Sequence, residues 1–125
     1  MKLIDTNIIL RFLLKDNLEL WAQAEAIINS GDDLLILDSV MAEVIYVLKK
    51  LYNVPKEKIA DCLLQLCNLG HIKTEHADVT LYAIKQYGIL SLDFVDILLY
   101  AYHVNQGIEV LSFDKKLNNL IKKTI

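Results

Sequence analysis

Four acidic side chains lie in or beside apolar segments of the sequence: Asp5, Glu43, Asp96 and Asp114. Charged residues are almost never buried without a partner, so a carboxylate in an apolar run must either point out of its element or meet a cation. Clustered carboxylates also repel one another unless a cation lies between them. If these four acids converge, we expect them to bind a hard divalent ion.

The ion that fits such a cluster is Mg²⁺ or Mn²⁺. Mg²⁺ prefers oxygen ligands, usually takes one or two carboxylates directly, and keeps waters that phosphate oxygens can replace. Mn²⁺ accepts the same donors. A metal-activated water can attack a phosphodiester while the metal stabilises the leaving oxygen. The residue types therefore predict the chemistry of a nuclease.

Local structure offers another interpretation of three of these acids. Asp5 could end a strand, Asp96 could form a capping box with Asp93, and Asp114 could cap the last helix. Glu43 is harder to explain in this way, because apolar residues surround it and no Lys or Arg lies four positions away on a helix. Spacing alone leaves both interpretations open.

The elements that must position these acids alternate along the chain in the manner of βα units on a parallel sheet. The predicted strands are Lys2–Ile4, Leu34–Leu37, His71–Lys73 and Ile108–Phe113. The predicted helices are Ile8–Leu14, Leu18–Asn29, one from Asp38 or Ser39 to about Tyr52, Lys56–Leu69, Glu75–Tyr87, Phe94–Asn105 and Lys115–Lys123. In open parallel sheets the ligand site lies beyond the carboxyl ends of the strands, so the four acids could face one crevice.

Composition limits the class of protein. A chain of 125 residues that is 54% hydrophobic fits one compact domain over 1–125 and excludes intrinsic disorder. The net charge of −3 gives no overall attraction to nucleic acid, so any binding depends on local lysine clusters and on Arg11. No apolar run approaches the roughly 18 residues that a membrane helix needs. Cys62 and Cys67 have no metal or disulfide spacing, which fits a reducing compartment. We therefore expect a soluble, cytoplasmic protein without a membrane partner.

Four segments together resemble the PIN domain family, specifically the VapC-type toxin ribonucleases: Leu3–Leu10, Met41–Val44, Phe94–Leu99 and Leu111–Leu117. They occur in the family's order and span essentially the whole chain. The resemblance implies a three-layer α/β/α sandwich with a central parallel sheet of about four strands. It also implies Mg²⁺- or Mn²⁺-dependent endoribonuclease activity on an RNA substrate, frequent homodimers, and inhibition by a small cognate antitoxin protein.

The resemblance also assigns roles to residues. Asp5 and Asp96 become the principal metal ligands, and Glu43 and Asp114 complete the catalytic site directly or through water. The Thr6 hydroxyl is expected to orient Asp5, because metal-site carboxylates usually need such a donor.

Three alternatives stay open at this point. Asp93 could take the place of Asp96, although Ile97 and the leucines after it favour Asp96 and leave Asp93 as an N-cap. Phosphatase chemistry at Asp5 usually needs a second acid two residues later, where this chain has Asn7. A catalytically silent PIN-like module that binds RNA or a protein is the third, and such a module should show no carboxylate-dependent metal uptake.

Overall fold

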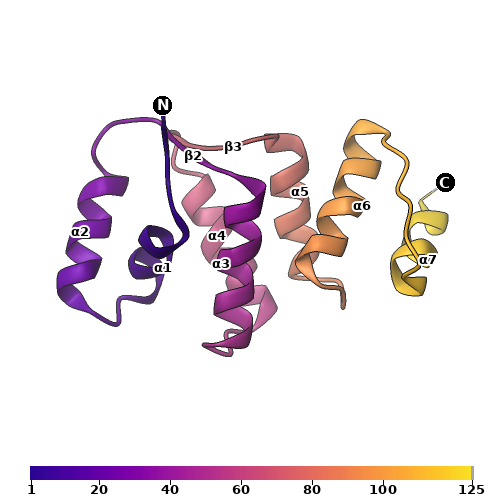
Figure 1. Ribbon diagram of the computed structural model, residues 1–125, viewed down its shortest axis with the longest axis horizontal. Coiled ribbons are helices and arrows are strands. Elements are labelled where there is room, and N and C mark those ends of the chain that lie inside the picture. Colours follow the sequence, from indigo (N-terminus) through magenta and orange to yellow (C-terminus); the bar gives the residue numbers. More distant parts are fainter. Residues whose placement is uncertain (125) are drawn as a thin grey trace.

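A computed structural model describes residues 1–124 of the chain (Figure 1). Within that range the chain forms three strands and seven helices: β1 (Lys2–Leu3), α1 (Thr6–Leu14), α2 (Leu18–Ile28), β2 (Leu34–Ile36), α3 (Asp38–Lys50), α4 (Lys56–Cys67), β3 (Ile72–Thr74), α5 (Ala77–Tyr87), α6 (Phe94–Gln106) and α7 (Lys115–Lys123). The domain predicted over 1–125 ends at Ile125, which lies outside the described residues.

The strands form one parallel sheet in the order β1-β2-β3. Lys2 lies opposite Leu34, and Leu34 lies opposite Ile72 on its other side. Parallel neighbours need crossover connections, and here helices supply them. The predicted α/β class with a parallel sheet flanked by helices is confirmed, as is the short edge strand predicted near His71.

The prediction of a fourth strand over Ile108–Phe113 was wrong. The segment runs between α6 and α7, and it pairs with no strand in the described part of the chain. Strand propensity measures how well a side chain fits a pleated, half-buried surface, so it needs a neighbouring strand to act on. Here the neighbouring elements are helices, and the sheet therefore has three strands instead of about four.

Local capping determines where several helices begin. Asp5 caps α1 by accepting a hydrogen bond from the Thr6 backbone N–H at 2.8 Å, and Asp114 caps α7 by accepting one from the Leu117 N–H at 2.8 Å. α6 ends at Gly107, whose φ of +68° is a conformation that glycine adopts without strain. Two of the four candidate acids therefore also have a structural function.

The core surrounds α3, whose buried face carries Met41, Val44, Ile45 and Leu48. α1 and α4 pack against this helix, α5 packs on α4, and α6 packs mainly on α5. α7 lies against α6 and buries Leu117 completely. Figure 1 shows the result as a row of helices, with α1 and α2 at one end of the long axis and α7 at the other.

Candidate active site

The first pair of predicted site residues, Asp5 and Glu43, lies around the N-terminal turn of α1. Asp5 follows β1 and caps this turn, while Glu43 is exposed on α3. Glu43 lines a cavity of about 250 Å³ together with Thr6 and Asn7, the first two residues of α1. The two carboxylates therefore belong to the same corner of the molecule, between α1 and α3.

Thr6 does not hold Asp5 in the predicted way. Its backbone N–H, and not its hydroxyl, donates to the Asp5 carboxylate. The Thr6 Oγ1 atom is buried and finds no hydrogen-bond partner among residues 1–124. A buried polar atom without a hydrogen-bond partner costs free energy. The Thr6 hydroxyl therefore still has a donor to offer, near Asp5 and Glu43.

The second group comprises Asp96, Asp93 and Asp114. Asp96 lies in the first turn of α6 and is half-buried. Burial raises the pKa of Asp96 above its usual value, and the charges of Asp114 and Asp93 raise that pKa further. Asp93 occupies the N-cap position of α6, as predicted, but its side chain makes no capping hydrogen bond. Asp93 thus adds negative charge to this group without the structural function expected of it.

The structure does not bring the two groups together. Across residues 1–124, no three acidic, histidine or cysteine side chains converge closely enough to hold a metal ion. Asp5 caps α1 and Asp114 caps α7, and these helices lie on opposite sides of the α3 to α6 row (Figure 1). Each group offers part of a donor set for Mg²⁺, but the complete four-acid site does not fit the ion in this arrangement. The assignment of the four acids to a metal stays a prediction.

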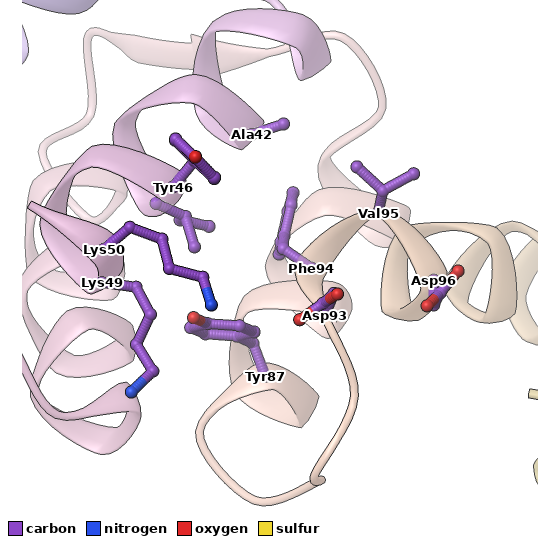
Figure 2. Close-up of a pocket in the computed structure, with 10 residues that line it drawn as sticks. Ala42, Tyr46, Lys49, Lys50, Tyr87, Asp93, Phe94, Val95 and Asp96 are labelled. Carbon is purple, nitrogen blue, oxygen red and sulfur yellow. The ribbon is translucent and has the colours of Figure 1, made fainter. Parts of the chain in front are cut away.

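A cavity of about 280 Å³ lies between α3 and the start of α6, lined by Ala42, Ile45, Tyr46, Lys49, Lys50, Tyr87, Asp93, Phe94, Val95 and Asp96. Figure 2 shows side chains from α3 on one side of it and Asp93 and Asp96 on the other. Lysine ammonium groups attract phosphates, and aromatic rings offer stacking surfaces to bases. The cavity therefore combines features that suit a nucleic-acid strand with two acids of the second group.

The sequence had shown Lys49 and Lys50 only as one of several lysine clusters. The spacing of Tyr46, Lys49 and Lys50 was a signal for this cavity, because residues three and four apart share one face of a helix. What the sequence did not show is that this face of α3 meets the N-terminus of α6.

Lys56 of α4 holds the loop that leads into α6. Its Nζ atom donates to the carbonyl oxygens of Leu90 and Leu92, the latter at 2.7 Å, and lies 4.4 Å from the ring centroid of Tyr87. Burial lowers the pKa of Lys56 below its usual value. A partly buried ammonium thus fixes the backbone immediately before Asp93, and with it the start of α6.

Two further acids, Asp38 and Glu75, follow the carboxyl ends of β2 and β3. The Asp38 carboxylate accepts hydrogen bonds from the hydroxyls of Thr80, at 3.0 Å, and Tyr102, while Glu75 accepts one from the Asp38 backbone N–H at 2.6 Å. Burial and the bond to Asp38 raise the pKa of Tyr102 above its usual range. These bonds tie α3, α5 and α6 together, so these strand-end acids have a positioning role that sequence analysis missed.

Comparison with known proteins agrees with the α/β fold. The family model of the PIN domain matches residues 2–123, which is nearly the whole chain, and the chain belongs to the PIN domain family. PIN domains are generally nucleases, so the fold is of a nuclease type. Neither a curated protein nor a solved structure matches the chain. None of the described helices has the length and apolar character required to cross a membrane.

Proposed function

We propose that this PIN domain is a Mg²⁺- or Mn²⁺-dependent endoribonuclease that hydrolyses RNA phosphodiesters. The observation that carries the proposal is the acidic group of Asp96, Asp93 and Asp114 beside a cavity lined by lysines and aromatic rings. A negatively charged protein needs such a local basic surface to approach RNA, because its net charge repels phosphate.

Different side chains of this cavity would bind different parts of the RNA. Lys49 and Lys50 neutralise the backbone phosphates, and Tyr46, which is 61% exposed, offers a ring face to bases. Burial raises the pKa of Asp96 most, and the charges of Asp114 and Asp93 raise it further. A cation placed among these three carboxylates would offset their mutual repulsion. A set that also includes Asp5 and Glu43 requires the two acidic groups to come together.

We further propose that the chain is the toxin of a type II toxin–antitoxin system, acts in the cytoplasm as a homodimer, and is inhibited by a cognate antitoxin. The support is the resemblance of its four segments to VapC-type toxins. A second support is the pair of exposed apolar residues directly after α3, Leu51 and Tyr52, which are 70% and 44% exposed and line the same cavity. Exposed apolar residues that lie close together are typical of surfaces that bind proteins.

A catalytically silent PIN-like module that binds RNA or a protein is the second candidate. The separation of the acids into two groups favours it, because a domain in which no complete metal site ever forms would bind RNA without cleaving it.

One experiment separates the two candidates. Single-stranded RNA is incubated with the protein and Mn²⁺, with EDTA in a parallel reaction, and Mn²⁺ binding is followed by isothermal titration calorimetry. We expect metal-dependent cleavage and a loss of about 100-fold in Asp96→Asn. The matched control Asp61→Asn, which neutralises an exposed acid of α4, should cleave like the wild type. RNA binding without cleavage and without carboxylate-dependent Mn²⁺ heat would establish the silent module.

A further inference from the structure

Four lysines lie on one side of α7, which follows Asp114. They are Lys115, Lys116, Lys122 and Lys123. A helix turns by about 100° per residue, so their spacing places all four side chains within an arc of about 120° around the helix axis. α7 contains no acidic residue, so this helix carries a formal charge of +4 and the rest of the chain carries −7. We call these four lysines the α7 lysine face.

The positive charge of the α7 lysine face is not neutralised by neighbouring acids. All four lysines are exposed, and none of them forms an ion pair within residues 1–124. The ion pairs of that range involve Lys2 and Arg11, which belong to the first part of the chain. Like charges on one side of a helix repel one another. A ligand with several negative charges would relieve this repulsion.

The helix dipole accounts for only half of the α7 lysine face. The first turn of a helix carries partial positive charge, and the last turn carries partial negative charge. Lys122 and Lys123 lie in the last turn, where a cation is favourable. Lys115 and Lys116 are the first two residues of α7, where the dipole favours acidic residues instead. Helix stability therefore gives no reason for the first pair, whereas an anionic ligand does.

The opposite side of α7 is packed against the protein. Leu117 is completely buried where α7 lies on α6. The hydroxyls of Tyr100 and Thr124 are 3.1 Å apart, and the Asn118 amide donates to the Ser112 carbonyl at 2.8 Å. A basic amphipathic helix that binds a membrane buries its apolar side in the lipid. In α7 this side is already used by α6, so the exposed lysines suit an anionic polymer in solution.

The α7 lysine face begins at the acidic group of the candidate active site. Asp114 is the N-cap of α7, and its charge acts on Asp96 of α6. Asp96 in turn lines the cavity that also contains Lys49 and Lys50 of α3. Figure 1 shows α3 on one side of α6 and α7 on the other. The acidic group therefore lies between two basic surfaces, one on α3 and one on α7.

We propose that the α7 lysine face binds backbone phosphates of the RNA whose other part occupies the cavity beside α3; this inference rests on the proposed function. The two pairs of lysines are seven residues apart, which is about 10 Å along the helix axis. Phosphates repeat along a nucleic-acid strand, so a row of lysines of this length can contact more than one of them. The bound RNA then extends to both sides of the acidic group.

The salt dependence of RNA binding tests the α7 lysine face without any cleavage. A fluorescent single-stranded RNA is titrated with protein in EDTA, and its anisotropy is followed at several KCl concentrations. Each lost phosphate contact lowers the slope of log K against log salt by about 0.7. The Lys115→Gln, Lys116→Gln double variant should therefore lower this slope by about 1.4 and bind RNA about 25-fold more weakly at about 0.1 M salt.

The matched control is the double variant Lys58→Gln, Lys85→Gln. Both lysines are exposed, on α4 and α5, so the control changes the net charge of the protein equally. At about 0.15 M salt, exposed charges act over only about 8 Å, so we expect less than a twofold change in affinity. An unchanged slope for the α7 variant, or an equal loss of affinity in the control, would overturn the proposal.

Thermal unfolding shows whether weaker binding comes from a loss of structure. Gln is a good helix former, and its introduction removes two cations from the first turn of α7. The Lys115→Gln, Lys116→Gln variant should therefore melt at the temperature of the wild type or slightly above it. A melting temperature below that of the control would give these lysines a structural function and would contradict the inference.

Cleavage kinetics distinguish failure of this inference from failure of the proposed function. If the wild type cleaves RNA, the α7 variant should raise KM about as much as it weakens binding and change kcat little, because its lysines contact RNA away from the reacting bond. An unchanged KM would refute the α7 lysine face and leave the proposed function intact. A wild type that binds RNA but cleaves none refutes the proposed function, and the salt slope then decides the α7 lysine face alone.

Discussion

Lys56→Met should destabilise the protein through one loop. The change removes two hydrogen bonds from a charged donor, to Leu90 and Leu92, and the contact with the Tyr87 ring. Hydrogen bonds to charged groups contribute about 1.5 to 3 kcal/mol and a cation–π contact about 0.5 to 2 kcal/mol. Met retains much of the apolar stem and relieves the desolvation that lowers the pKa of Lys56. We therefore expect a net loss of about 2 kcal/mol in the free energy of unfolding.

The assay is urea unfolding followed by circular dichroism and by the fluorescence of Trp21. Lys58→Met is the matched control, because Lys58 is exposed two residues further along the same helix, and it should change stability by less than about 0.5 kcal/mol. Lys56→Met should also weaken RNA cleavage, since the loop places Asp93 and the start of α6. Equal stability of the two variants would refute this account of the loop.

Three further predictions concern single side chains. Asp5→Asn should keep the cap of α1 and its stability, whereas Asp5→Ala should lose about 1 kcal/mol in urea unfolding, and both should lose RNA cleavage. Because the pKa of Asp96 is raised in the folded protein, the stability it contributes is present at low pH and is lost as the pH rises through that pKa. Asp96→Asn should therefore be more stable than the wild type by up to about 1 kcal/mol at pH 7, with no difference near pH 3, as unfolding at both pH values will show. Tyr102→Phe should lose about 1 to 2 kcal/mol in thermal unfolding, because the Asp38 carboxylate loses one of its two hydroxyl donors; unchanged stability would show that this bond contributes nothing.

Sequence reasoning predicted most elements of this fold because their signals are local. Helical periodicity located all seven described helices, and Asp5 and Asp114 mark helix starts by a capping preference that depends on neighbouring residues only. The segment 108–113 shows the limit of this reasoning. Its composition is that of a strand, but whether it becomes one depends on which sheet edge lies within reach, and the order of residues does not contain that information.

The candidate site was predictable in part for the same reason. Asp96 and Asp114 flank one α6 to α7 unit, and the structure places them within electrostatic reach of each other. Asp5 lies toward the other end of the row, because β1 and β3 occupy opposite edges of the sheet, and Glu43 lies on α3, between α1 and α6. The carboxyl ends of strands are visible in a sequence, whereas the lateral position of each strand and of the helix after it is a property of the assembled sheet.

The length and charge of β1 have a consequence for solubility. An open sheet edge can act as a template for unlimited stacking of chains into filaments. Here the edge is only two residues long, and one of them is Lys2, whose ammonium is held 2.8 Å from Asp32. A charged side chain on so short an edge discourages the stacking of further strands, so the chain can remain dispersed although this edge is open.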